Sequence, residues 1–573
     1  MSLWLVAGCD TSTSLGPPTN GDQGNTSNTQ NQPKGADSTT APVDNGDGGS
    51  NPPPPPPFVP PRIDAFVIKN RQKFIGLPAY IKGVEYDSFS FTVTTAPAHG
   101  QLIGSAPNLC YIPEANYTGY DQLTYRADSG GDSITLTLYI SVGTDFVAPI
   151  GIPAPEFGVT QSHTMYLGAT YDYNGATGSY HDAGNGPYTH YVDFDTGNDT
   201  GNPYGTAASP RKSIPEGLTP GSVVELHGTN VTTPAIHNIR GEGTLNQPIF
   251  IRGASPANKA VLRRNVVVEG NYIICENLEF DCRDAPSEVW FWITSTQVPP
   301  FITFHHVALR HSLFHDQPTM PTGNPCAMVA DLVGFDPALD TGALQIENIV
   351  AYDLEVRNFS QWDNFAGGQD YVGVVFGTNT QNCWALDCHL HHLHSTGVSV
   401  CRCNGTPNMT PPNHIYAGRN YVHNVKEQCI VFKNAVDCVC SQNVCHTVRV
   451  SDSSVGTAIP ILNNDGTADW PGSDEIWVLF NTVYDCERGV FHNLTAGLLP
   501  GGVLPPGRLS RSYVIGNTFF DIRAIRGSLN SFGMAVFNGN FSQSRLINNL
   551  VRDCSEGFRL GVPGMATPEV CGQ

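Results

Sequence analysis

The sequence predicts an all-β protein whose C-terminal two thirds form a parallel β-helix. Three observations predict this class: a recurring asparagine motif, short runs in which polar and apolar residues alternate, and a composition rich in turn-forming residues. Only 14% of the 573 residues are charged, while 59 are Gly and 44 are Pro. Such chains are typical of β proteins with many turns, and this one is too long for a single hydrophobic core.

The chain begins with a short apolar segment that ends in Val6-Ala-Gly-Cys9. This segment resembles the lipobox of bacterial lipoproteins, although the usual basic start is missing. The resemblance implies an exported protein lipidated at Cys9, with residues 1–9 as a signal remnant. A truncated signal peptide of another kind is the alternative. Asp10, directly after the cysteine, leaves open whether the anchor lies in the inner or the outer membrane. No later segment has the roughly 18 consecutive apolar residues that cross a bilayer.

Residues 10–62 read as a disordered tether. They consist mostly of Thr, Ser, Asn, Gly, Asp and Pro and end near the proline run 52–57. Such a stretch buries too little apolar surface to offset its ordering entropy, and prolines extend it. We therefore expect it to hold the folded part away from the membrane anchor.

Residues 63–145 alternate in polarity as short strands divided by turns, which predicts a small β-sandwich. The strings Ala96-Pro-Ala-His-Gly-Gln-Leu and Tyr111-Ile-Pro-Glu-Ala-Asn-Tyr-Thr-Gly-Tyr-Asp-Gln-Leu-Thr-Tyr resemble cadherin-like or immunoglobulin-like repeats of bacterial surface proteins. That resemblance implies a spacer or adhesion module without a catalytic role. Residues 146–190 are a connector.

Residues 191–573 form the predicted β-helix. The string Tyr191-Val-Asp-Phe-Asp-Thr-Gly-Asn resembles the opening segment of right-handed parallel β-helix proteins of the pectate-lyase-like superfamily, and Pro220-Gly-Ser-Val-Val-Glu-Leu-His resembles a first strand and turn. Downstream, a motif recurs in which an apolar residue follows a ladder position by two places. Its Asn-containing copies begin at Asn420, Asn443, Asn481, Asn517 and Asn549, and others begin at Leu278, Leu354 and Cys388.

The motif spacing runs from 23 to 43 residues when a coil at His311 is counted, so one coil takes about 22 residues and loops take the surplus. Equivalent residues of successive coils should stack about 4.8 Å apart. The asparagines should then form an internal ladder in which each amide bonds the next.

The same register predicts an outward-facing file three places after each ladder position, because alternate residues of a strand face opposite sides. We expect an exposed stripe of aromatic rings and forked donors that could hold a sugar chain. Its members are Asp281, Phe314, Arg357, His391, His423, His446, Tyr484, Phe520 and Arg552. A solvated sheet face that happens to collect histidines is the alternative. A metal site is another, because His389 shares the strand face of His391.

Lys433 ends the run Cys429-Ile-Val-Phe-Lys, in which Ile430 and Phe432 take inward positions, so we expect its amine to point outward. In several polysaccharide lyases of the superfamily that this chain resembles, a lysine or arginine on such a face removes a proton beside a uronic carboxylate. That analogy makes Lys433 a candidate base, with Arg402 or Arg449 as its positive partner. An ordinary exposed lysine is the alternative.

Two acidic loops offer oxygen ligands for calcium. Asp363 and Asp370 lie in one, and Asp465, Asp469 and Asp474 lie in the other. Neither matches the calcium-binding hand motif, so solvated loops are the alternative. Trp362 and Trp470 in the same loops could stack against sugars.

The net charge limits the classes of binding partner, and the cysteine spacing limits the kinds of metal site. The net charge of -21 disfavours nucleic acid and also an acidic polysaccharide, unless a local basic patch or cation inverts the field. Thirteen of the 16 cysteines lie between Cys275 and Cys554. Without a CxxC pair of zinc spacing, we expect most of them to be buried inside the β-helix and a few to form disulfide bridges, with a metal site as the alternative.

The sequence therefore predicts a monomeric, surface-anchored, polysaccharide-binding lipoprotein that touches the membrane only through its lipid. Two function classes stay open. One is a polysaccharide lyase acting by β-elimination on a uronic acid polymer, and the other is a non-catalytic glycan-binding adhesin. Glycoside hydrolysis is less favoured, because no pair of carboxylates occupies adjacent outward positions.

Overall fold

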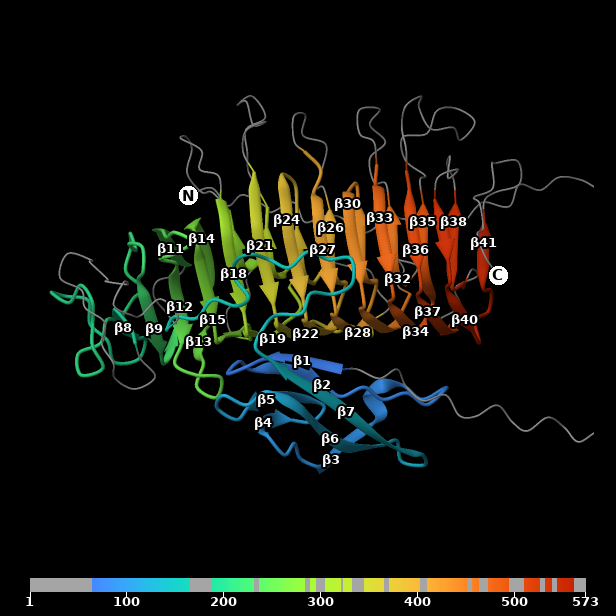
Figure 1. The fold of residues 1–573 in the computed structure, drawn as a ribbon, viewed down its shortest axis with the longest axis horizontal. Helices are drawn as coiled ribbons and strands as arrows, with labels where there is room; N and C mark the ends of the chain where they lie inside the picture. The colour runs from blue at the N-terminus through green and yellow to red at the C-terminus, as the bar shows by residue number, and fades with distance from the viewer. Residues whose placement is uncertain are drawn as a thin grey trace, which may run out of the picture.

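The computed structural model describes residues 64–164, 187–230, 236–283, 289–294, 304–320, 323–331, 345–364, 370–401, 410–450, 456–462, 472–493, 510–525, 531–537 and 544–560. Regular structure in these segments is almost entirely β-strand, and the order of the strands confirms the predicted class (Figure 1). Two small sheets precede a long right-handed parallel β-helix. The described part of the chain has no helix of the length and hydrophobicity that crossing a bilayer requires.

The first domain is a β-sandwich of a four-stranded and a three-stranded sheet. Its first sheet has the order β1 (Asp64–Ile68), β7 (Ser133–Gly143), β6 (Gly119–Asp128), β3 (Ser90–Thr95). Its second has the order β2 (Lys73–Gly76), β5 (Asn108–Pro113), β4 (Gly100–Ser105), and the short 3-10 helix η1 spans Tyr86–Ser88. Alternate residues such as Leu123, Tyr125, Leu138 and Ile140 face the shared core, as the polarity pattern predicts.

Each coil of the β-helix contributes one strand to each of three parallel sheets. The twelve-stranded sheet, here called the strap sheet, consists of β8 (His190–Asp193), β9 (Val223–His227), β12 (Ile249–Gly253), β15 (Ile273–Glu276), β18 (Phe304–Arg310), β21 (Ile346–Tyr352), β24 (Thr380–Leu386), β27 (Asn413–Gly418), β30 (Val436–Ser441), β33 (Asp474–Leu479), β36 (Ser512–Ile515) and β39 (Arg545–Ile547).

The second sheet, here called the docking sheet, follows the strap sheet after a two-residue bend in the coils from β18 onward. It consists of β10 (Thr229–Asn230), β13 (Ala260–Leu262), β16 (Leu278–Asp281), β19 (Leu313–Gln317), β22 (Glu355–Phe359), β25 (His389–Leu393), β28 (Tyr421–Val425), β31 (Val444–Val448), β34 (Thr482–Cys486), β37 (Thr518–Ile522) and β40 (Leu550–Arg552).

The third sheet completes the coil. It consists of β11 (Ile236–Glu242), β14 (Asn265–Asn271), β17 (Val289–Ile293), β20 (Cys326–Ala330), β23 (Val372–Phe376), β26 (Thr396–Cys401), β29 (Gln428–Lys433), β32 (Thr457–Leu462), β35 (Arg488–Asn493), β38 (Met534–Phe537) and β41 (Phe558–Leu560).

The predicted asparagine ladder lies at the bend between the strap and docking sheets. Asn420, Asn443, Asn481 and Asn517 each donate through Nδ2 to Oδ1 of the next asparagine at 2.9 Å, and Asn549 ends this run. Each Oδ1 also accepts the backbone N–H of the preceding rung at 2.8–2.9 Å. Backbone N–H groups at the bend have no partner in the sheets, and the asparagine side chains of the ladder supply hydrogen-bond acceptors for them.

The residue before each rung has a left-handed backbone. Its φ is 51° at Arg419, 57° at Gln442, 53° at Phe480 and 69° at Gly516. Only Gly adopts this conformation without strain, so the ladder and the packing around it impose it on the other three side chains.

Inward side chains of the three sheets form one continuous apolar core. The prediction of buried cysteines is confirmed for the described residues, where twelve cysteines are free thiols and eleven of them are buried. Burial raises the pKa of thiols such as Cys383 and Cys388 to about 12, which keeps them protonated and unreactive.

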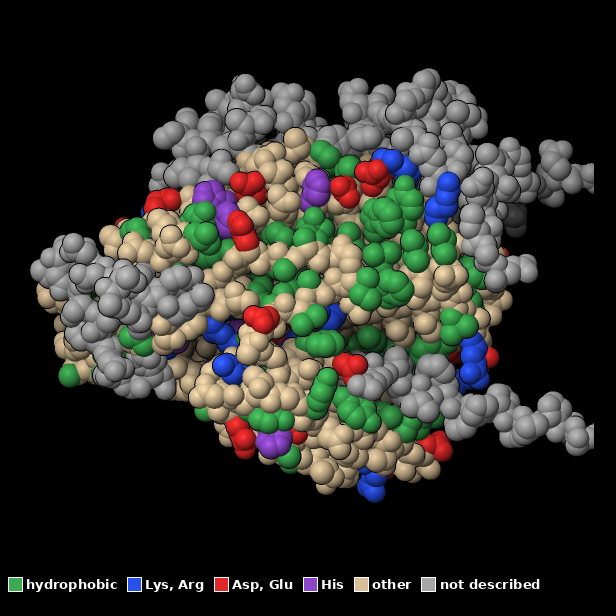
Figure 2. Space-filling model, viewed as in Figure 1, with side chains coloured by type: hydrophobic (Ala, Val, Ile, Leu, Met, Phe, Trp, Pro, Cys, Tyr) green, Lys and Arg blue, Asp and Glu red, His purple; other side chains and the backbone are tan. Residues whose placement is uncertain are grey.

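The sandwich packs directly against the outer face of the docking sheet (Figures 1 and 2). Lys73 Nζ lies 3.2 Å from Asp353 Oδ1, and the backbone N–H of Phe74 donates to the same oxygen at 2.9 Å. Glu85 Oε2 accepts from Arg449 at 2.8 Å. A spacer would stand apart from the β-helix, whereas this domain lies against it.

Residues 144–164 then cross the strap sheet as an extended strap (Figure 1). Ile152, Phe157 and Val159 pack onto its outward apolar side chains. The buried Arg310 side chain joins the two layers, because it bonds Glu276 Oε2 at 2.7 Å and donates to strap carbonyls such as that of Gly158 at 2.9 Å. Two of the three outer faces of the β-helix are thus partly covered by the N-terminal part of the same chain.

Candidate functional site: a buried histidine file and a tyrosine groove

The residues predicted to form a file do stand in register on the docking sheet. His391 pairs with His423, His423 with His446, and His446 with Tyr484 in successive strands. The rings stack nearly parallel, with centroids 4.9 Å apart for His391 and His423, 4.8 Å for His423 and His446, and 4.6 Å for His446 and Tyr484. Phe520 extends the stack at 4.7 Å from Tyr484.

One member of the predicted file is wrong. Phe314 faces inward, where its ring stacks on Phe280 at 4.2 Å. His315 takes the outward position between Asp281 and Arg357. The ladder position expected at His311 in this coil was one residue too early. A shift by one residue turns outward-facing side chains of a strand inward and inward-facing ones outward.

The predicted exposure is also wrong for the middle of the file, although Arg552 at its end is exposed. His391, His423, His446 and Tyr484 are each at most 2% exposed, because the sandwich covers them. The ring of Tyr86 lies 4.6 Å from that of His423, and that of Tyr80 lies 5.4 Å from that of Tyr484. A stripe of flat, partly apolar rings suits a domain contact as well as it suits a sugar. In this structure it is closed to a polysaccharide.

Asp87 at η1 fixes the polar edge of this contact. Its carboxylate accepts from His392 Nε2 at 2.9 Å, from Asn424 Nδ2 at 2.7 Å and from Trp362 Nε1 at 3.2 Å. Burial raises the pKa of Asp87, but the hydrogen bond and charge of His392 outweigh burial and hold the pKa below its ordinary value. Trp362, predicted as a sugar platform, is partly buried and is engaged with the sandwich instead.

The stacked histidines are neutral. Burial lowers the pKa of His423 to about 3, with the charge of His392 acting in the same direction. Burial also lowers the pKa of His391 and His446 well below the ordinary value, and neighbouring histidines lower each further. Neutral imidazoles are metal ligands and hydrogen-bonding groups rather than anion-binding cations.

The predicted catalytic residues do not come together on one exposed face. Lys433 lies at the end of β29 in the third sheet, between Cys401 and Leu462, and is 1% exposed. Its outward position agrees with the prediction, but its amine is buried. Arg402 lies outside the described residues.

Arg449 follows the docking sheet. Its guanidinium donates to Asp485 Oδ2 at 2.7 Å and to Glu85 Oε2 at 2.8 Å. Burial disfavours its charged form, but the two carboxylates outweigh burial and raise the pKa of Arg449. This arginine joins the sandwich to the β-helix. Arg357, predicted to bind substrate, donates instead to Glu355 Oε1 at 2.8 Å.

The acidic loops are described only in part. Asp363 is exposed, whereas Asp370 is buried and accepts from Ser395 Oγ at 3.1 Å. Asp474 bonds Arg511 at 2.6 Å. Asp465, Asp469 and Trp470 lie outside the described residues, as does Cys9. The calcium and lipidation sites therefore stay predictions.

Sequence reasoning missed an open concavity on the outer face of the first sandwich sheet. It encloses about 520 Å³. It is lined by Asp64, Phe66, Ala98, His99, Tyr120, Asp121, Gln122, Tyr139, Ile140 and Ser141. We call it the tyrosine groove, because the Tyr120 side chain is 86% exposed and that of Tyr139 is 39% exposed.

The register of β6 and β7 creates this groove. Tyr120 pairs with Ser141 and Gln122 pairs with Tyr139, so the two tyrosines are diagonal neighbours on one face. Diagonal neighbours of an antiparallel pair lie about 7–8 Å apart. The signal was present in the sequence as Tyr120, Gln122, Tyr139 and Ser141 at alternate positions, but only the pairing shows that they meet.

The floor and one rim of the groove are rigid. Asp121 accepts from the backbone N–H groups of Ala98 at 2.8 Å and His99 at 2.9 Å, and from the Tyr111 hydroxyl at 2.9 Å. These bonds outweigh burial and lower the pKa of Asp121. The His99 ring stacks on Tyr117 at 4.2 Å. The groove is thus shaped before any ligand binds.

No protein family model matches the sequence, and no curated protein matches it either. Solved structures do resemble it. An alginate lyase from Paenibacillus sp. str. FPU-7 is 12% identical, with 60% of this chain and 98% of that chain covered at a TM-score of 0.33. A mannuronic acid specific polysaccharide family 6 lyase from human gut microbiota is 13% identical, with 58% and 77% covered and a TM-score of 0.33.

A rhamnogalacturonan lyase is 15% identical, with 66% of this chain and 86% of that chain covered at a TM-score of 0.32. Similarities at these TM-scores and identities carry no argument about what this chain binds or does. The residues of the chain itself carry the functional inference.

Proposed function

We propose that this protein binds a polysaccharide through the tyrosine groove of its sandwich. The observation that carries the proposal is the Tyr120 side chain, which stands 86% exposed at a preformed concavity beside a second exposed tyrosine. Rigid aromatic faces beside polar groups suit the C–H faces and hydroxyls of a pyranose. Large aromatic side chains left in water at a concave surface are typical of binding sites.

The polar lining favours a neutral glycan. Gln122, Ser141 and His99 can donate to or accept from sugar hydroxyls, and Asp64 adds a carboxylate at the edge. Among the described residues that line the groove, none is a lysine or arginine. A uronic acid polymer would meet no cation there, and the net charge of -21 would repel it at longer range.

Binding without cleavage is the better supported class. Of the three residues predicted to carry β-elimination, Lys433 is buried in the third sheet and Arg449 is engaged by two carboxylates. The β-helix then acts as a long rigid body that presents the groove. With a lipid at Cys9 and a tether over residues 10–62, it would stand on the outside of the cell.

The experiment is a binding screen of the purified full chain. Affinity electrophoresis against neutral β-glucans, α-glucans, xylans and mannans, with alginate and pectate as acidic counterparts, should show retardation by a neutral polymer. Tyr120→Ala should weaken that binding about tenfold, as expected when a central aromatic anchor is truncated. Phe480→Ala is the matched control, because Phe480 is an aromatic residue 44% exposed on the β-helix.

Two results would contradict the proposal. One is binding that survives Tyr120→Ala together with Tyr139→Ala, and the other is retardation by no polymer in the panel. The same panel, followed for absorbance of unsaturated products with and without calcium, tests β-elimination. Product formation would restore the lyase class.

A further inference from the structure

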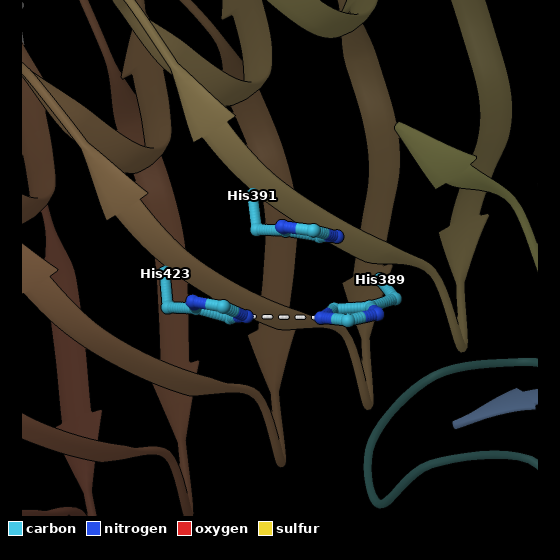
Figure 3. A group of neighbouring side chains, drawn as sticks. All are labelled: His389, His391 and His423. Atoms are coloured by element: carbon cyan, nitrogen blue, oxygen red, sulfur yellow. Dashed lines mark hydrogen bonds between the residues drawn. The ribbon is translucent and has the colours of Figure 1, made fainter. Parts of the chain in front are cut away.

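Three buried imidazoles meet on the outer face of the docking sheet (Figure 3). His389 and His391 alternate along β25, so they share a face, and His423 follows His391 in register on β28. One nitrogen from each ring lies within 4.8 Å of the others. All three side chains are at most 2% exposed.

The far sides of two rings have fixed partners. His423 Nδ1 lies 2.8 Å from Asn424 Oδ1, and Asn424 already uses its amide hydrogens toward Asp87, so His423 Nδ1 is the donor. Its Nε2 then carries the lone pair. This arrangement, in which the outer N–H is held by an oxygen, is the one that orients metal-binding histidines.

The outer nitrogen of His391 also has a fixed partner, which is a nitrogen of His392. Its Nδ1 lies 2.7 Å from His392 Nδ1, and His392 Nε2 lies 2.9 Å from Asp87 Oδ1. His392 therefore holds the outer nitrogen of His391 and links it to Asp87, which leaves His391 Nε2 as the nitrogen that a metal ion can take. Asp87 thus orients both rings through one intermediate side chain each.

Two ring nitrogens of this cluster have no hydrogen-bond partner. His391 Nε2 has no hydrogen-bond partner, and the nearest carboxylate oxygen, Glu355 Oε1, lies 3.7 Å away. His389 Nε2 lies 2.9 Å from the bare Nε2 of His423 and must supply the proton between them, which leaves His389 Nδ1 bare and without a partner. A buried acceptor without a partner is unfavourable. A cation bound by His391 Nε2, His423 Nε2 and one nitrogen of His389 would replace the hydrogen bond between His389 and His423 and would give His391 Nε2 a partner.

We propose that His389, His391 and His423 bind one transition-metal ion of the zinc type. Imidazole is a ligand that such ions favour, and the Glu355 carboxylate stands near enough to complete a fourth position. Zinc–nitrogen bonds of about 2.0–2.1 Å place ligand nitrogens about 3.3 Å apart. The widest pair therefore closes by roughly 1.5 Å, which requires the His391 ring to tilt from its stack on His423.

A metal ion at this place would hold two coils together directly beneath Tyr86 and Asp87 of the sandwich, so metal binding and domain docking should stabilise each other.

The test is metal titration of the chelator-treated full chain. Zn²⁺ should bind at one ion per chain with micromolar or tighter affinity and raise the thermal midpoint, and Co²⁺ should give the visible spectrum of a low-coordinate nitrogen site. His391→Gln and His423→Gln should each lose this binding. His414→Gln is the matched control, because His414 is half exposed and pairs only with Asp437 among the described residues outside its own turn.

Absence of stoichiometric binding to the wild-type chain would overturn the proposal. So would binding of equal affinity in His391→Gln and His423→Gln variants whose circular dichroism matches the wild type. If these variants do not fold, X-ray absorption of the zinc-loaded wild type decides the matter, because three imidazole ligands on the zinc support the site and two or fewer contradict it.

Discussion

The asparagine ladder is open to a quantitative test at Asn481, which occupies a fully buried rung. Asn481 Oδ1 accepts from the backbone N–H and from Nδ2 of Asn443, both at 2.9 Å. Its Nδ2 donates to the Cys440 carbonyl at 3.0 Å and to Asn517 Oδ1 at 2.9 Å. Asn481→Ala removes all four bonds and opens a small cavity.

The expected loss of stability follows from the groups left without partners. The Asn443 backbone N–H loses its acceptor and the Cys440 carbonyl loses a donor, in a place that water does not reach. Each buried polar group that is left without a hydrogen-bond partner costs about 1–3 kcal/mol, so the free energy of unfolding should fall by about 3 kcal/mol. Asn549→Ala is the matched control, because Asn549 is a partly exposed rung at the end of this run and water can replace its partners. Its cost should be about 1 kcal/mol.

The assay is urea unfolding followed by circular dichroism and by tryptophan fluorescence on the full chain. Coincidence of the two transitions is needed before free energies are compared. Equal losses for Asn481→Ala and Asn549→Ala would refute the reasoning, since they would mean that the buried rung does not depend on its neighbours.

Two further predictions concern domain docking and acid. A Cβ at Gly76 would lie 2.5 Å from the His389 ring, so Gly76→Val should undock the sandwich and speed histidine carbethoxylation at the file. Gly131→Val should not, because nothing lies within 4 Å of a Cβ there and the backbone is not left-handed. Burial lowers the pKa of His190 and His237 to about 4 and of His492 to about 3. The unfolded chain binds these protons near pH 6.5, so stability is full above that pH and should fall by about 2 kcal/mol per histidine at pH 5. An unchanged urea midpoint between pH 8 and pH 5 would contradict this.

The sequence was sufficient for the architecture of the β-helix. Recurrence of Asn420, Asn443, Asn481 and Asn517 with apolar residues two places later predicted the ladder, because a period of one coil leaves little choice of register. The same register placed His391, His423 and His446 in one file. It failed at Phe314, where no asparagine marked the rung.

The burial of the file could not be predicted. It depends on contacts such as Asp87 with His392, which are 305 residues apart, and nothing in either local sequence indicates that the two meet. The tyrosine groove was missed for a related reason. Its residues alternate in the sequence as ordinary exposed strand positions do, and only the pairing of β6 with β7 brings Tyr120 beside Tyr139.

Hydroxyl-radical footprinting of the full chain, with and without the neutral polysaccharide that binds best, tests most directly where the glycan lies. We predict that oxidation of Tyr120 and Tyr139 falls when the polymer is added, while His391 and His423 stay unlabelled in both states because the sandwich covers them. Protection that maps to the β-helix, with Tyr120 labelled equally in both states, would contradict the proposed binding surface.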